Sequence, residues 1–162
     1  MDLLFQQFVQ TQHHSNKSTK MSKNEVKVLR TTWLDGPSIW TYKPAIEVTL
    51  DIQGYEQHPS NLLPGFNERL NALLPGLIEH HCGVGYRGGF CERLRDGTYA
   101  AHILEHITIE LHNLIGQPIK FGKARMTSVE GVYKLVFHTP DKQVGLACFE
   151  VAQRLFQADR KS

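Results

Sequence analysis

The chain has 162 residues, of which 41% are hydrophobic and 21% charged, a balance that excludes an intrinsically disordered or fibrous protein. Its net charge of +2 is too small to indicate a nucleic acid or an anionic membrane surface as a partner. No apolar run approaches the roughly 18 residues that a membrane-spanning helix needs. Three cysteines are an odd and sparse set that favours a reducing compartment, and we expect the cytoplasm. Nine histidines make histidine chemistry the first function to consider.

A polar stretch precedes the first periodic segment of the chain. Residues 1–24 have neither helical nor strand periodicity, so we expect a flexible tail in which His13 and His14 are exposed. Met21 is an alternative start within this tail. A single domain is expected over 25–158, followed by a short tail at 159–162.

Apolar periodicity and turn residues divide the rest of the chain into strands and helices. We predict strands over 26–34 and 45–52, helices over 65–74 and 77–81, a glycine-rich stretch at 83–89, a helix over 98–115, strands over 119–126 and 132–139, and a helix over 145–158. The order ββ-αα-ββ-α predicts an α+β fold, with a mostly antiparallel sheet and helices packed on one face.

The best-defined helix is predicted over 98–115, with Thr98 as its N-cap. At about 100° per residue, its apolar side chains fall within an arc of roughly 120°, which is the predicted core face. His102, Glu105 and His106 gather on the opposite side of the helix. This helix therefore carries the polar residues that are most easily assigned a chemical task.

The run His102-Ile103-Leu104-Glu105-His106 has the pattern H-x-x-E-H, an inverted relative of the zincin motif. Histidines at i and i+4 project side by side and can share one Zn²⁺, and a glutamate one turn away can take a proton from water. We therefore predict His102 and His106 as zinc ligands and Glu105 as the catalytic base. The same residues would also form an ordinary solvated polar face, and this alternative stays open.

A catalytic zinc needs a third protein ligand, which the spacing does not identify uniquely. Glu110 continues the i+4 series, but it lies about 12 Å along the helix from His102. We expect it to orient His106 from outside the ligand set instead. Glu79, at the end of the preceding helix, is the favoured third ligand. The alternatives are His80, Cys148 and Glu150.

The glycine-rich stretch matches the dinucleotide pattern G-x-G-x-x-G over 83–88. That pattern needs a preceding strand, and a helical segment precedes it here, so we do not expect a nucleotide site. The stretch is interpreted as a tight loop that makes Arg87 available for a carboxylate, with His80 as a second substrate-binding residue. A purely structural loop is the open alternative.

The remaining cysteines and basic residues give weaker signals. Cys82 and Cys91 lack a usual metal-clip spacing, so we expect core or loop thiols. Scattered positive charges either form solvated faces or hold an acidic polymer or peptide; they are Arg93, Arg95, Lys120, Lys123 and Arg125.

Several short motifs occur along the chain in a fixed order. They are Gly36-Pro37-Ser38-Ile39-Trp40, Leu63-Pro64-Gly65-Phe66, Leu73-Leu74-Pro75-Gly76-Leu77-Ile78-Glu79-His80-His81-Cys82, Arg87-Gly88-Gly89-Phe90 and His102-x-x-Glu105-His106. On these motifs the chain resembles the amino-terminal domain of cyanophycin synthetase over about 26–157. The full family enzyme polymerises aspartate and arginine with ATP, using an ATP-grasp domain and a Mur-ligase-like domain. The chain stops where those domains would begin, so we do not expect an ATP-dependent ligase.

The resemblance implies a domain that binds the Asp-Arg polymer cyanophycin, with synthetase domains on a separate chain as further partners. In some family members such a domain also acts as a metal-dependent peptide hydrolase that cuts the polymer into primers. Carried onto this chain, His102 and His106 would hold the metal and Glu105 would activate water. The alternative is a catalytically silent polymer-binding or scaffold module.

Overall fold

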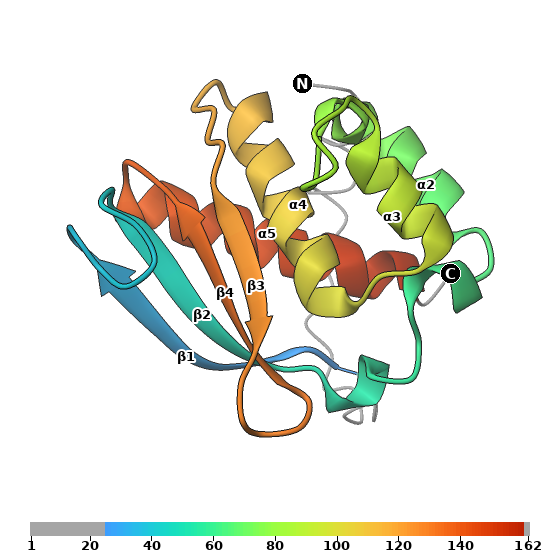
Figure 1. Cartoon of the computed structure of the whole chain (residues 1–162), viewed down its shortest axis with the longest axis horizontal. Helices are drawn as coiled ribbons and strands as arrows, with labels where there is room; N and C mark the ends of the chain where they lie inside the picture. Colours follow the sequence, from blue (N-terminus) through green and yellow to red (C-terminus); the bar gives the residue numbers. More distant parts are fainter. Residues whose placement is uncertain (1–24, 161–162) are drawn as a thin grey trace, which may run out of the picture.

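A four-stranded antiparallel sheet forms one layer of the computed structural model, which describes residues 25–160 (Figure 1). Its strands lie in the order β1-β2-β4-β3. They span β1 (Lys27–Leu34), β2 (Ala45–Asp51), β3 (Gly122–Met126) and β4 (Val132–His138). The predicted tail over 1–24, with His13, His14 and Met21, lies outside the described residues.

Two long helices, α4 (Ala100–Leu114) and α5 (Lys142–Arg160), pack against each other and against one face of the sheet. Two shorter helices, α2 (Phe66–Leu73) and α3 (Gly89–Asp96), lie at the end of the molecule away from β1 (Figure 1). The 3₁₀ turns at Gln53–Tyr55, Ser60–Leu62 and Pro75–Glu79 occur between β2 and α3. This arrangement confirms the predicted α+β fold with an antiparallel sheet and helices on one face.

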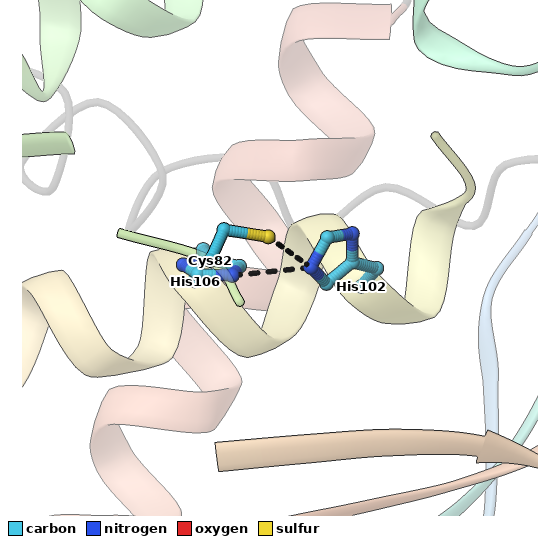
Figure 2. Close-up of side chains that lie close together, drawn as sticks. All are labelled: Cys82, His102 and His106. Carbon is cyan, nitrogen blue, oxygen red and sulfur yellow. Dashed lines mark hydrogen bonds between the residues drawn. The ribbon is translucent and has the colours of Figure 1, made fainter. Parts of the chain in front are cut away.

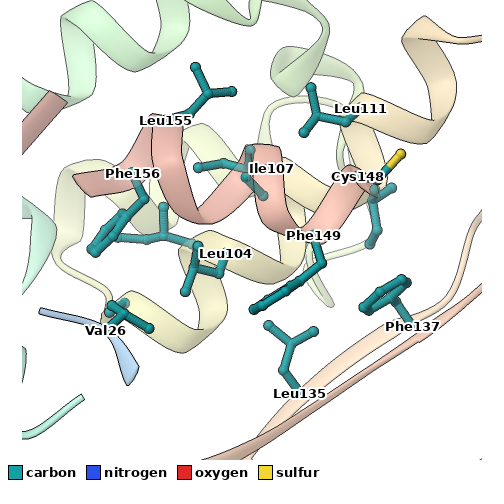
Figure 3. Packing of buried hydrophobic residues seen from close by; sticks show 14 of the residues in the cluster. Val26, Leu104, Ile107, Leu111, Leu135, Phe137, Cys148, Phe149, Leu155 and Phe156 are labelled. Carbon is teal, nitrogen blue, oxygen red and sulfur yellow. The ribbon is translucent and has the colours of Figure 1, made fainter. Parts of the chain in front are cut away.

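The core lies between the sheet and the α4–α5 pair. Alternation along β2 turns Ile46, Val48 and Leu50 toward the helices, and all three are fully buried. In the antiparallel register, Ile46 lies opposite Phe137 and Val48 opposite Leu135 on β4. Figure 3 shows apolar side chains of α4 and α5 packed above these two strand residues. Burying this apolar surface fixes how α4 lies on the sheet.

Several element boundaries differ from the prediction. Helix α3 was missed, because its first residue is a glycine and much of its sequence is charged. The segment predicted as a helix over 77–81 is instead the 3₁₀ turn Pro75–Glu79. Helix α5 begins earlier than predicted and continues to Arg160, past the expected domain end at 158.

The start of α4 also differs. Tyr99, not Thr98, occupies the N-cap position, and no side chain caps the helix there. The Thr98 hydroxyl instead lies 2.8 Å from Nδ1 of His102, one turn into the helix. Within the part of the chain that the structure describes, none of the helices has the length and apolar character required to cross a membrane.

Candidate metal centre

The polar face of α4 is buried rather than solvated. Glu105 and His106 are only 8% and 6% exposed. Residues 79–83 border this face together with β3, around one pocket. Strand β3 approaches so closely that a Cβ at Gly122 would lie 2.7 Å from Cγ of Glu105. The alternative of an ordinary solvated helix face is therefore wrong.

Three side chains converge at this face (Figure 2). Nε2 of His102 lies 3.1 Å from Sγ of Cys82 and 3.1 Å from Nε2 of His106. The three atoms all lie within 4.8 Å of one another. Among residues 25–160, this group (the Cys82–His102–His106 cluster) is the one in which at least three possible metal ligands come together.

The donor set of this cluster fits zinc. Zn²⁺ binds thiolate and imidazole at about 2.3 and 2.0 Å, which places the ligand atoms of one tetrahedral site roughly 3.3–3.6 Å apart. The two observed separations of 3.1 Å are close to this range. A soft sulfur with two nitrogens is also a donor set that zinc prefers to magnesium or calcium. The cluster can hold the ion with small side-chain shifts.

Cys82 reaches the cluster through an unusual turn. Its φ is 46°, which makes it the one non-glycine residue with a positive φ between residues 25 and 160. Such backbone is uncommon for side-chain-bearing residues and concentrates at functional sites. The spacing of Cys82 to Cys91 is unlike a metal clip and predicts only a core or loop thiol. Its partner is His102, twenty positions away, and only its place after two histidines hinted at this.

An aromatic ring holds the two histidines in place. Phe90 of α3 stacks on His106, with ring centroids 4.0 Å apart and the rings 19° from parallel. The same ring meets His102 edge to face at 5.7 Å. Helix α3, which sequence reasoning missed, therefore supplies the packing that orients both imidazoles.

Further hydrogen bonds engage the outward nitrogens of both imidazoles. Nδ1 of His102 is bonded to the Thr98 hydroxyl, as described above. Nδ1 of His106 lies 2.8 Å from Nδ1 of His80. Nε2 of His80 in turn lies 2.9 Å from a carboxylate oxygen of Glu110. Both Nε2 atoms are thereby left facing the cluster.

Both histidines of the cluster are neutral at pH 7. Burial is the main cause that lowers the pKa of His102 to about 4, with a contribution from the Arg93 charge. Burial also lowers the pKa of His106 to about 2, helped by its neighbours His102 and His80. Neutral imidazole is the form that binds a metal.

Glu105 lies beside the cluster. One carboxylate oxygen is 4.0 Å from Nε2 of His106. Burial raises the pKa of Glu105 to about 7, opposed by the backbone N–H of Ala124 and the charge of Lys123. A carboxyl group with a pKa near neutrality can both take and return a proton at pH 7.

A pocket of about 910 Å³ opens over the cluster. Its lining includes the three cluster residues, Glu105 and three basic residues, Arg93, Lys120 and Lys123. Arg93 also contacts the Cys82 thiol, where its charge opposes the rise that burial causes in the thiol pKa. Part of the positive charge that looked scattered in the sequence therefore surrounds one pocket.

The other predicted site residues lie in two places. The structure brings His80 and Glu110 to the cluster, where both are buried. It places Glu79 outside the group: its side chain is 61% exposed and bonded to Arg87, with 2.7 Å between Oε1 and Nη2. Arg87 is thus already paired with a carboxylate of this chain.

Two of the three alternatives for the third ligand, Cys148 and Glu150, lie on α5. Cys148 is buried in the core and is absent from the possible metal group. Glu150 forms an ion pair with Arg154 one turn along the same helix. In place of the favoured Glu79, the structure brings Cys82 to the two histidines.

The fold and the cluster define an α+β domain with a candidate zinc centre on its most buried helix. Residues 47–158 match the model of the cyanophycin synthase-like N-terminal domain. The chain therefore belongs to this family, as the sequence motifs indicated.

Curated relatives support the same family. The chain is 44% identical over 132 residues to a cyanophycin synthetase of Geminocystis herdmanii and 43% identical over 132 residues to one of Synechocystis. A cyanophycin synthetase of Trichormus variabilis is 36% identical over 135 residues. The matches cover 80–82% of this chain but 15% of each relative. The chain thus spans about a seventh of the length of these relatives.

Proposed function

We propose that this domain binds cyanophycin or a similar charged peptide polymer and hydrolyses it with a zinc ion held by Cys82, His102 and His106. The observation that carries the proposal is the convergence of these three ligand atoms beside the Glu105 carboxylate in one pocket. An H-x-x-E-H motif alone does not identify the third zinc ligand. In the fold, the sulfur of Cys82 lies beside the two histidines of the motif.

Each part of the pocket has a role in the proposed reaction. A zinc ion supplies a Lewis acid that polarises the scissile carbonyl and makes water more acidic. Glu105 takes a proton from the attacking water and returns it to the leaving amine nitrogen, so that the peptide C–N bond is replaced by a carboxyl and an amine. Phe90 keeps His106 oriented throughout.

The basic residues of the pocket fit the carboxylates of such a charged polymer. Arg93, Lys120 and Lys123 line it and can pair with carboxylates along an Asp-Arg chain. These cations also support the competing function, a polymer-binding module without catalysis. Binding alone therefore does not distinguish the two functions.

The experiment is incubation of the purified domain with cyanophycin, with and without a chelator, while polymer length is followed. We expect shortening that stops with the chelator and returns when zinc is added. Glu105→Gln is expected to bind the polymer and leave it intact. If polymer length is unchanged by zinc-loaded wild-type protein that binds the polymer, the silent module is the correct function.

The partners and compartment follow from the same proposal. The relatives named above are synthetases, and we propose that polymerising domains, in this chain or another, supply the polymer. All three cysteines are free thiols, and Cys82 must stay reduced to bind zinc. A reducing compartment such as the cytoplasm meets this requirement.

A further inference from the structure

A chain of buried hydrogen bonds leads away from the Cys82–His102–His106 cluster. His106 contacts His80 at 2.8 Å, nitrogen to nitrogen, and His80 contacts Glu110 at 2.9 Å. The His80 and Glu110 side chains are only 7% and 6% exposed. Two polar side chains buried this deeply, yet outside the possible ligand group, need a role of their own.

The proton positions in this hydrogen-bond network follow from Glu110, the member farthest from the cluster. A carboxylate oxygen accepts hydrogen bonds, so Nε2 of His80 carries a proton and donates it in a hydrogen bond to Glu110. The amide of Asn113 donates to the same oxygen at 3.3 Å, so this oxygen is an acceptor for two neighbours. With its proton on Nε2, a neutral His80 can only accept at Nδ1, so His106 must donate from Nδ1. Nε2 of His106 is then left bare and faces the cluster.

The opposite proton arrangement is also chemically defined. A doubly protonated His80 would donate to Nδ1 of His106, and the proton of His106 would then sit on Nε2. That proton would occupy the position that a metal needs. The two arrangements are therefore distinguishable by the tautomer of one ring.

The backbone leaves room for this arrangement at one glycine. A Cβ at Gly76 would lie 1.8 Å from a carboxylate oxygen of Glu110. A side chain at position 76 would therefore press on the Glu110 carboxylate, which must shift to make room, and we expect its contact with His80 to be disturbed. A substitution at Gly76 can therefore disturb the hydrogen-bond network without changing His106, His80 or Glu110 themselves.

We propose that His80 and Glu110 are positioning residues that fix His106 as the Nδ1–H tautomer and so prepare its Nε2 to bind the metal. The proposal rests on the zinc centre proposed above and deepens it. It replaces the expectation that His80 binds substrate. The sequence predicts that Glu110 orients His106 directly, whereas in this proposal it acts on His106 through its hydrogen bond with His80.

The first test reads the tautomer in metal-free protein by long-range ¹H–¹⁵N correlation of the imidazole rings. In wild type we expect the proton of His106 on Nδ1 and that of His80 on Nε2. In His80→Phe and in Gly76→Ala, His106 is expected to lose its fixed Nδ1–H signature. A wild-type His106 with its proton on Nε2 overturns the proposal.

The second test measures zinc affinity by competition with a chelator. We expect His80→Phe and Glu110→Leu to bind zinc about 10–100-fold more weakly, the usual effect of losing a partner of a metal-bound histidine. Glu110→Gln keeps an oxygen that accepts from His80 and is expected to recover most of the affinity. The visible spectrum of the Co²⁺-loaded variants shows whether the coordination geometry has changed.

The matched control is His112→Phe, on the same helix. His112 is also fully buried, but its ring bonds to Thr108 and Thr139 and is absent from the possible ligand group. Its zinc affinity should equal that of wild type. Equal affinities for His80→Phe and the control, in proteins with the same circular dichroism, would overturn the proposal.

Failure of the proposed function gives a different result. If wild type binds zinc with the expected tautomers but leaves the polymer intact, the hydrolase fails and the positioning role stands. If wild type cleaves the polymer while His80→Phe retains full zinc affinity, the positioning role fails alone. If wild type binds no zinc, both fail.

Discussion

The two ends of α4 bury histidines in opposite ways. Near its C-terminal end, His112 is completely buried, with Nδ1 donating to the Thr108 carbonyl at 2.8 Å and Nε2 3.2 Å from the Thr139 hydroxyl. Near its N-terminal end, His102 and His106 turn one nitrogen each toward a shared point beside Cys82. At both ends the histidines are held by protein atoms, but only one end leaves ligand atoms that point at each other.

The difference shows that burial alone does not identify a site. Each nitrogen of His112 meets one protein atom, as expected of a histidine that stabilises the fold. At the cluster, hydrogen bonds at Nδ1 leave two neutral nitrogens and a thiol together. What distinguishes a candidate metal centre is therefore the convergence of donor atoms after the other bonds have been assigned.

The largest expected effect comes from a substitution in the cluster, at the N-terminal end of α4. His106→Ala removes a ligand atom, so zinc affinity should fall by more than the roughly 100-fold that a residue outside the ligand set contributes. Elemental analysis of purified protein measures this as loss of stoichiometric zinc. The same substitution at His112 should leave zinc content unchanged. Equal zinc in both variants would contradict the assignment of the two ends.

The next effect concerns catalysis without metal loss. Glu105→Gln removes the proposed base, and polymer cleavage should slow by about 10²–10⁴-fold, the usual contribution of general base catalysis. Zinc content should remain at the wild-type level. The initial rate of cleavage measures the effect, and an unchanged rate would show that Glu105 has no part in the reaction.

A third substitution tests the other end of α4. His112→Leu removes two buried hydrogen bonds, to the Thr108 carbonyl and the Thr139 hydroxyl, so the free energy of unfolding should fall by about 1–3 kcal/mol. Urea unfolding of metal-free protein measures this change. A matching loss of zinc affinity would contradict a purely structural role for His112.

The pH dependence of stability sharpens this third test. Burial lowers the pKa of His112 below its ordinary value of 6.5. The unfolded chain therefore takes up the proton first, and the His112 contribution to stability is present above pH 6.5 and is lost as the pH falls below it. The unfolding free energy of His112→Leu should fall less steeply with decreasing pH in this range. An unchanged slope would argue against the lowered pKa.

The smallest effect concerns the edge of the pocket. Lys123→Gln removes an exposed cation at the pocket, so binding of the polymer should weaken by about two- to fivefold. Added salt should reduce the difference between variant and wild type, because it screens the charge. Titration of the polymer at two salt concentrations measures both values, and zinc affinity serves as the unchanged control.

Sequence patterns predicted the layers of the fold well. Apolar periodicity placed β2 and β4 within one residue of their bounds, and the helical pattern located α4 within two residues of its ends. The spacing of His102 and His106 likewise follows from helix geometry alone. Such features depend on residues close together in the chain.

The missed features depend on contacts between distant segments. Cys82 meets His102 only through a left-handed turn that no periodicity encodes. The polar face of α4 is buried because β3 packs beside it, and the close approach at Gly122 comes from tertiary structure. The proposed base Glu105 could thus be named from the motif, but its environment could not.

The turn that carries Cys82 has a mechanical consequence. Cys82 precedes α3 while its two companions lie on α4, so one ion bound by all three would cross-link segments twenty positions apart. The loop closed in this way contains α3 and with it Phe90. Because a ligand that binds only the folded state stabilises it by mass action, metal occupancy would also control how readily this loop opens. Removing the ion would release this cross-link, so the amount of available zinc would affect how long the loop stays closed as well as the proposed reaction.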